Sequence, residues 1–516
     1  MYSTADWLQQ ALVLCVRFSE MEAKEREAQF GELEKIYHAF SQDEQESICD
    51  MLRSQLDNQT FIYVHSILIK YLTAPEFKDA ILDCMLQMDY NWYWGSMMEW
   101  QVIVNIKTCY EKKRLLHKKN VDKYNITLGS IDYGFLPLEK RNKRKIIIMT
   151  GQLLSVLHAP TKMVLDFAYI LQERLDYELL IFVCPCDGGL PDGYWQDESR
   201  ENARKEFEKM PMRLEYKDAI FHGYQVNMSA INIKEYYMML ELIHAWNPLF
   251  VFNVGMENPV ADLAGEFTTV AAMEVSLACP VSEAQILVRL GRLEEMEEEY
   301  ERVTVRNGQT QIFMEEKMPV LIDKSPNTYI RTEFEMPEDK FLIAIVGNRL
   351  DTEIDLEFIQ TMKHILDDNE EAVFVVIGDV ERLKDYFFEA SYQSRIFYLG
   401  YCTDLMGIYS MMDFYMNPKR GGGGFSSQMA LVAGIPVVTL PDCDVAYHAG
   451  DEFIVETYSA MESRVSACMN DKAYYAELKK LAGKKAESNT ETKMVQYVEA
   501  MLEKINDCME ANISKS

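Results

Sequence analysis

Four consecutive glycines, at positions 421–424, mark the part of the chain best suited to bind an anion. They follow an apolar strand pattern at 414–416 and precede a helical pattern that opens at Ser426 and stops at Gly434. Glycines let the backbone approach a ligand closely, and the start of a helix offers N–H groups and a positive dipole end. A strand pattern at 436–440 completes a predicted βαβ unit. We expect a phosphate-like group to contact Arg420, Gly423, Gly424, Phe425, Ser426 and Ser427.

A second arginine, Arg349, follows a buried strand pattern at 341–347. Ligands of open parallel sheets bind beyond the carboxyl ends of the strands. A guanidinium there can contact two phosphate oxygens at once. Arg349 is therefore a second candidate for a phosphate clamp, and an ordinary surface arginine is the alternative.

His158 and Glu257 are the candidates for moving a proton. His158 lies in a loop at 152–160, after a strand pattern at 145–150, and Glu257 follows a strand pattern at 249–254. An imidazole accepts or relays protons near neutral pH, and a carboxylate beyond a strand end is the other choice of base. The alternatives are an ordinary polar contact for His158 and capping of the next helix for Glu257.

The order of signals over residues 396–440 resembles the C-terminal half of GT-B glycosyltransferases. The resemblance rests on Leu399-Gly400-Tyr401, on the glycine turn and on the closing segment 433–438. It implies that the turn at Tyr401 lies against a nucleotide base and that the glycine turn holds the diphosphate of a sugar nucleotide. His158 would line the cleft near the acceptor and the sugar.

The resemblance has a further consequence and a departure. Asp444 is expected in a cleft loop, in contact with sugar hydroxyls, and no metal is expected at Asp442-Cys443-Asp444. Many retaining members carry two glutamates at the positions of Gly421 and Met429, and neither residue is acidic here. The version in this chain is more similar to inverting transferases related to O-linked GlcNAc transferase, although those have an aspartate where Met429 stands.

Composition sets outer bounds on the class of protein. An apolar content of 48% and a charged content of 26% are those of a globular protein, and 516 residues predict several domains. A net charge of -30 argues against nucleic acid as a partner. No segment has the length and apolarity of a membrane span, and the 11 scattered cysteines indicate reduced thiols. These features favour a cytoplasmic protein, and we expect a bacterial one.

Hydrophobic periodicity changes from helical to alternating strand and helix near position 145. We predict an α/β protein of the GT-B class, in which two Rossmann-like domains with parallel sheets face a cleft. The predicted domains are an all-helical one at 1–138, a first Rossmann-like one at 139–325 and a second at 326–516, whose last helix crosses back. The aromatic segment 90–94 is either core packing or a docking surface.

Two hypotheses follow for the function. The first is a metal-independent hexosyltransferase or N-acetylhexosaminyltransferase without a cofactor, whose substrate is a nucleotide sugar, by resemblance a UDP-sugar. The N-terminal helices would recognise a protein or glycan acceptor, a sister subunit or a second copy of the chain. The second hypothesis is a GT-B-shaped binding subunit without turnover, which the missing acidic residues at Gly421 and Met429 favour.

Overall fold

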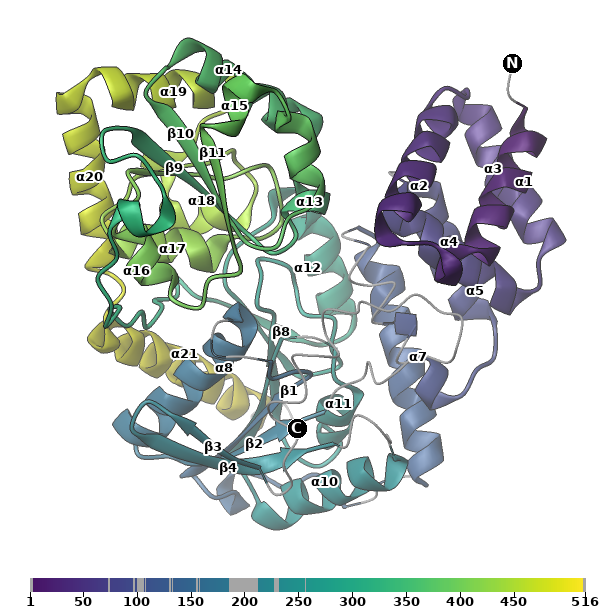
Figure 1. The fold of residues 1–516 in the computed structure, drawn as a ribbon. Helices are drawn as coiled ribbons and strands as arrows, with labels where there is room; N and C mark the ends of the chain where they lie inside the picture. Colours follow the sequence, from purple (N-terminus) through teal and green to yellow (C-terminus); the bar gives the residue numbers. More distant parts are fainter. Residues whose placement is uncertain are drawn as a thin grey trace. The chain divides into compact units, whose positions relative to one another are not determined.

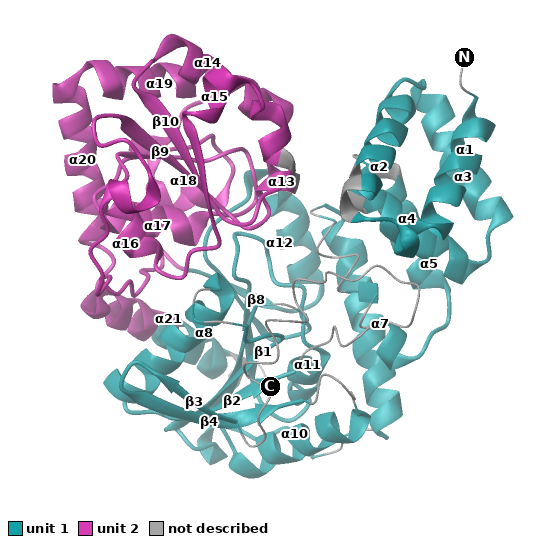
Figure 2. Ribbon diagram, viewed as in Figure 1, with its two compact units in different colours: residues 1–313, 502–516 teal, residues 314–501 magenta. Residues whose placement is uncertain are grey.

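The computed structural model describes residues 3–72, 75–95, 98–99, 106, 108–129, 131, 133–154, 156, 158–184, 212–226, 232–255 and 257–513. The chain forms two compact units (Figure 2): unit 1 holds Met1–Phe313 and Leu502–Ser516, and unit 2 holds Met314–Met501. The helical region and the first Rossmann-like sheet therefore share one unit. The final helix, α21 (Glu491–Ile513), contributes residues to both units. The division into three domains stays a prediction.

The chain begins with a bundle of helices, drawn in purple in Figure 1. Capping residues start several of them: Ser3 and Asp6 form a capping box, as do Ser41 and Glu44, and Asp57 accepts two backbone N–H groups. Their apolar faces meet in one core around Trp7, and the predicted helical region is confirmed. The helices are α1 (Thr4–Val16), α2 (Ala23–His38), α3 (Gln42–Gln55), α4 (Asn58–Tyr71) and α5 (Pro75–Gln87).

Helix α7 (Tyr110–Leu128) joins this bundle to the first sheet. Its Leu116 belongs to the bundle core, whereas Tyr110, Val121 and Tyr124 belong to the core beneath the sheet. Trp92 packs edge-on against Tyr124, with ring centroids 5.1 Å apart. For Trp92, the core-packing reading of the aromatic segment therefore holds.

The sheet of unit 1 has eight strands in the order β3-β4-β2-β1-β5-β6-β7-β8, with every pair parallel except β3 and β4. The chain builds outward from β1 in one direction and then from β5 in the other. The switch point, where ligands of such sheets bind, therefore lies between β1 and β5. The strands are β1 (Lys145–Thr150), β2 (Glu178–Val183), β3 (Met212–Tyr216), β4 (Ala219–Gln225), β5 (Phe250–Val254), β6 (Val270–Met273), β7 (Ile286–Arg289) and β8 (Thr310–Phe313).

Described helices around this sheet are α8 (Ala159–Tyr169), α10 (Ile233–Trp246), α11 (Pro259–Ala264) and α12 (Glu297–Arg306). Asn258 caps α11, because its side-chain oxygen accepts the N–H of Ala261. The N-cap position is thus held by Asn258, and Glu257 directly precedes it.

The sheet of unit 2 has five parallel strands in the order β11-β10-β9-β12-β13. Its switch point lies between β9 and β12. The strands are β9 (Phe341–Val346), β10 (Ala372–Ile377), β11 (Ile396–Gly400), β12 (Phe414–Met416) and β13 (Val437–Val438). The helices are α13 (Leu350–Glu353), α14 (Leu356–Asp368), α15 (Ala390–Gln393), α16 (Leu405–Tyr409), α17 (Gly424–Val432), α18 (Asp444–Ala449), α19 (Tyr458–Asn470) and α20 (Lys472–Ala486).

The α/β class, the two Rossmann-like sheets and the helical N-terminal region are thus confirmed. The ten cysteines within the described residues are all free, and most are buried. Over the same residues, none of the helices combines the length and the apolarity needed to cross a bilayer.

Candidate active site

In unit 2, the predicted anion site lies at the switch point. Strand β9 ends at Val346 and leads to Arg349, and strand β12 ends at Met416 and leads to the glycine turn. Gly423 has a φ of 84° and precedes α17, whose first residue is Gly424. A Cβ on Gly423 would lie 2.5 Å from Nη2 of Arg420, so glycine is needed there for space as well as for backbone conformation.

Arg420 fills the space beneath this turn, with a side chain only 3% exposed. Its guanidinium donates to Oδ1 of Asn417 at 2.9 Å, to Oε2 of Glu353 at 2.9 Å and to the carbonyl of Val346 at 2.6 Å. A fourth bond reaches the hydroxyl of Tyr415. These bonds tie the glycine turn to the end of β9, so the observed role of Arg420 is structural, and its predicted contact with a donor stays a prediction.

Arg349 lies in the turn before α13, with a side chain 65% exposed. Its Nη2 is 2.8 Å from Oε1 of Glu353 and 3.4 Å from the place of a Cβ on Gly422. The guanidinium therefore stands over the glycine turn. Of the two predicted cations, Arg349 is the more accessible, as a phosphate clamp requires.

The first turn of α17 presents backbone N–H groups beside this cation. Its first intrahelical bond runs from the N–H of Ser427 to the carbonyl of Gly423, so the preceding N–H groups have no intrahelical acceptor. The hydroxyl of Ser426 lies 3.0 Å from that of Tyr415, and the hydroxyl of Ser427 donates to the carbonyl of Gly424. Phe425 is partly buried against the core of unit 2.

Two further predicted residues lie along the same edge of this sheet. Tyr401 directly follows β11 and is 48% exposed, as a residue that stacks on a base would be. Asp444 is the first residue of α18, and its Cβ lies 3.3 Å from the place of a Cβ on Gly424. The structure thus brings Asp444, Arg349 and the glycine turn together.

Sequence reasoning missed His448, which lies on α18 against the start of α17. A Cβ on Gly424 would lie 2.7 Å from Cδ2 of its ring, and its Nδ1 contacts the side-chain amide of Gln428. Burial, and then the nearby ammonium of Lys317, lower the pKa of His448 to about 3. A neutral imidazole therefore lies beside the predicted donor loop. Its only signal in the sequence is a position four residues after Asp444.

In unit 1, the two candidate proton carriers follow the two switch-point strands. His158 lies between β1 and α8, where its Nδ1 is 3.1 Å from the hydroxyl of Thr161. That hydroxyl also accepts the N–H of Leu154, which connects the residues after β1 to the start of α8. His158 is partly exposed.

Glu257 follows β5 in a strongly acidic setting. Burial, and then the neighbouring carboxyls of Glu274 and Glu99, raise the pKa of Glu257 to about 8. Burial lowers the pKa of Lys113 of α7, although the carboxyls of Glu257 and Glu274 act in the opposite direction. Glu257 is therefore mainly protonated at neutral pH and becomes a base only as the pH rises.

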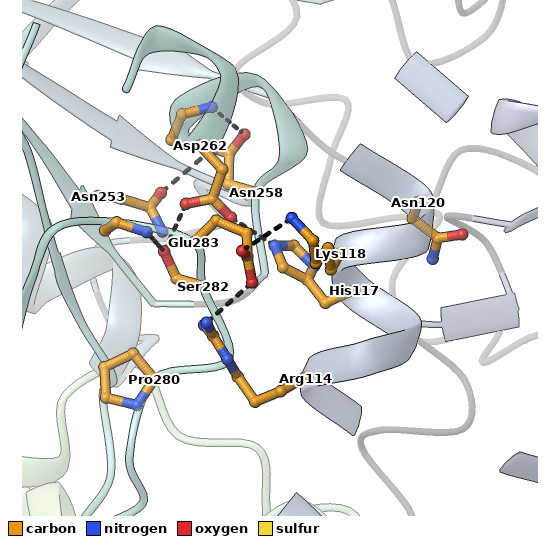
Figure 3. Close-up of polar contacts among 12 residues, drawn as sticks. Arg114, His117, Lys118, Asn120, Asn253, Asn258, Asp262, Pro280, Ser282 and Glu283 are labelled. Carbon is orange, nitrogen blue, oxygen red and sulfur yellow. Dashed lines mark hydrogen bonds and ion pairs between the residues drawn. The ribbon is translucent and has the colours of Figure 1, made fainter. Parts of the chain in front are cut away.

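A buried network lies beside this edge (Figure 3). His117 of α7, which is fully buried, contacts Asp262 of α11 through Nε2. Its Nδ1 lies 2.9 Å from Oε1 of Glu99. Ser282 donates to the other oxygen of Asp262. Burial alone would lower the pKa of His117, but Glu99 and Asp262 raise it well above the usual range. A cation held between two carboxylates thus fixes α7 to the sheet domain.

Part of the chain matches a known family model, and the whole chain is similar in fold to solved structures. The family model for the group 1 glycosyl transferases matches residues 341–471, which include Arg349, the glycine turn and Asp444. An O-GlcNAc transferase mutant from Thermobaculum terrenum superposes with a TM-score of 0.56 at 13% identity, over 99% of this chain and 100% of that one. An α,α-trehalose 6-phosphate synthase from Burkholderia multivorans gives 0.50 at 10% identity, over 73% and 99%.

These two likenesses show a shared fold. No curated protein sequence matches the chain. Within the described residues, no cluster of three or more histidine, cysteine, aspartate or glutamate side chains is arranged to hold a metal ion.

Proposed function

We propose that this chain, in which residues 341–471 are a group 1 glycosyl transferase domain within a GT-B fold, moves a sugar from a UDP-sugar to a protein or glycan acceptor. The observation that carries the proposal is the guanidinium of Arg349 over the glycine turn at the switch point of unit 2. Transfer from a sugar nucleotide leaves growing negative charge on the diphosphate. A preorganised cation and helix N–H groups stabilise that charge.

The two candidate bases differ in their surroundings. His158 is partly exposed, and its imidazole would accept the proton of the acceptor hydroxyl. Glu257, with its pKa raised to about 8, would do so only in weakly basic solution. We therefore propose His158 as the base at neutral pH and Glu257 as a hydrogen-bond donor there.

The proposal includes a metal-independent reaction in the cytoplasm, with the nucleotide sugar as a substrate rather than a cofactor. The likeness to a protein named as an O-GlcNAc transferase makes N-acetylglucosamine the first sugar to test. The N-terminal helices α1–α5 are proposed to bind the acceptor, a sister subunit or another copy of the chain.

Thermal unfolding with added nucleotides tests the donor site. UDP at a hundredfold excess over its Kd should stabilise the protein by about 2.7 kcal/mol, which is measurable as a rise in Tm. GDP and ADP are tested separately as alternative nucleotides, and uridine is the control without phosphate. If no nucleoside diphosphate at millimolar concentration raises the Tm, the donor site assigned here is wrong.

A second candidate function is a binding subunit without turnover. The observation in its favour is that Met429, at one position where many retaining members carry glutamate, is 7% exposed and packs in the core of unit 2. Transfer and hydrolysis of radiolabelled UDP-N-acetylglucosamine decide between the two. Tight UDP binding without either reaction, across a broad panel of acceptors, would favour the binding subunit.

A further inference from the structure

Glu353 is the link between the two arginines of the donor site. Its Oε1 lies 2.8 Å from Nη2 of Arg349, and its Oε2 lies 2.9 Å from Nη1 of Arg420. One carboxylate thus uses both oxygens on two guanidinium groups from opposite sides of the switch point. Arg349 follows β9 and Arg420 follows β12, so Glu353 joins the two strand ends whose separation forms the site.

Exposure decreases along this chain of contacts. The side chain of Arg349 is 65% exposed, that of Glu353 16% and that of Arg420 3%. A surface ion pair alone contributes little, because two flexible side chains must be ordered in water. Here the carboxylate is already held by Arg420, which is fixed by the carbonyl of Val346 and by Asn417. Arg349 therefore meets an acceptor whose position is set from the interior.

Two glycines leave the room that this arrangement needs. A Cβ on Gly347 or on Gly423 would collide with the guanidinium of Arg420. At the other end of the chain of contacts, Nη2 of Arg349 lies 3.4 Å from the place of a Cβ on Gly422. The guanidinium of Arg349 is thus held beside the glycine turn.

We propose that Glu353 is a positioning residue, which transmits the fixed position of Arg420 to Arg349 and aims Arg349 at the diphosphate of the donor. The inference rests on the proposed function. Two guanidinium groups and one carboxylate leave a net charge of about +1, so an anion is still attracted. Glu353 itself touches no substrate and acts through Arg349.

A purely electrostatic role for Glu353 predicts the opposite result. A carboxylate near a diphosphate repels it, so its removal would tighten binding if position were unimportant. The positioning role predicts weaker binding, because a released Arg349 must be ordered again when the diphosphate binds. The sign of the change therefore separates the two roles.

The test is a double-mutant cycle on the full chain. Calorimetry measures the affinities of UDP and uridine for the parent, Glu353→Gln, Arg349→Ala and the double variant. Glu353→Gln should weaken UDP roughly tenfold, as expected for loss of a charge-assisted contact, and leave uridine unchanged. In the Arg349→Ala background the same substitution should have no further effect.

Two further variants guard against misfolding and non-specific charge effects. Glu353→Asp keeps the charge but is too short to bridge both arginines, and it should also weaken UDP. Glu370→Gln removes an exposed carboxylate from the turn before β10, at the opposite edge of the sheet, and should change nothing. The melting temperature is recorded for each variant.

The outcomes are distinct. If the parent binds UDP and Glu353→Gln binds it equally or more tightly, the positioning role is wrong and the proposed function stands. Equal losses for UDP and uridine, or a loss that persists in the Arg349→Ala background, also overturn it. If the parent binds neither UDP, GDP nor ADP, the proposed function and this inference fail together.

Discussion

The two switch points of this protein share a topology and differ in chemistry. In unit 2 the edge carries an exposed Arg349 and the N–H groups of α17. In unit 1 the corresponding edge carries Glu257 and Glu274, which interact with Glu99, Lys113 and His117 of the N-terminal region. The fold fixes where each site can form, and the few residues that follow each strand decide whether it attracts an anion or moves a proton.

The two edges are also held in place in different ways. In unit 2 the support is local, since Arg420 and Glu353 come from the turns that follow β12 and β9. In unit 1 it comes from α7, a helix outside the sheet domain proper, through the pair formed by His117 and Asp262. The acidic edge therefore depends on the N-terminal region, whereas the contacts described for the cationic edge come from unit 2.

The largest effect is expected from the candidate bases. His158→Ala should lower turnover by about 10²- to 10⁴-fold, as loss of a general base does, with little change in UDP affinity. Glu257→Gln should cost less near neutral pH, because the carboxyl there is already mainly protonated. Turnover of labelled UDP-sugar gives the rates, and calorimetry gives the affinities.

The pH profile of turnover distinguishes the two bases. A base acts when deprotonated, so the rate rises with pH through the pKa of the group that serves. A rise near about 6.5 indicates a histidine. A rise near pH 8 that Glu257→Gln abolishes would reverse the assignment. His222, exposed on β4 of the same sheet, supplies the control substitution His222→Ala.

The next largest effect is expected from the buried network of unit 1, and it is an effect on stability. His117→Gln leaves Glu99 and Asp262 buried without their cation, and loss of one partner of a buried ion pair costs about 3–5 kcal/mol. Denaturant unfolding at neutral pH measures it. His38→Gln, which alters a partly exposed pair with Glu34, should change the free energy of unfolding by less than about 0.5 kcal/mol.

The pH dependence of this contribution has a definite sign. The pKa of His117 is raised on folding, so its stabilisation is complete below the ordinary histidine value of about 6.5. This stabilisation is lost as the pH rises through the higher pKa that His117 has in the folded state. The gap between the parent and His117→Gln should therefore narrow in basic solution, and a gap that widens there would show that the imidazolium does not hold α7.

Sequence patterns predicted the strands that carry the sites, because long apolar runs such as β1, β5 and β9 are buried on both faces. They missed the antiparallel pair β3 and β4, whose residues are half exposed, and the short β7 and β8. In these strands the apolar signal is too weak or too brief to stand out from the helical segments.

The roles of side chains were harder to predict than their positions. Arg349 and Arg420 both follow strands and both looked suited to phosphate. What separates them is that Arg420 meets the carbonyl of Val346 and the carboxylate of Glu353, 74 and 67 residues away in the chain. His117 likewise meets Asp262 at a separation of 145 residues. Such partners are set by tertiary packing and leave no local signal.

The smallest effect is expected from alanine substitutions at the two ends of α17. They test whether the glycine turn needs glycine for space or only for backbone conformation. Gly423 and Gly434 bound α17 and have similar φ values, 84° and 77°. Alanine at either position should cost about 1–2 kcal/mol of strain. A Cβ on Gly434 meets nothing within 4 Å, whereas one on Gly423 lies 2.5 Å from Nη2 of Arg420 and 3.0 Å from Oδ1 of Asn417.

Because four hydrogen bonds hold Arg420 in place, its guanidinium cannot yield easily to a new methyl group. Gly423→Ala should therefore lower the free energy of unfolding by more than Gly434→Ala does, and only Gly423→Ala should weaken UDP binding. Denaturant unfolding and calorimetry on the two variants measure the difference. Equal losses of stability with unchanged UDP affinity would mean that the glycine turn serves only as a helix start. The edge of unit 2 would then not be the anion site that distinguishes it from the edge of unit 1.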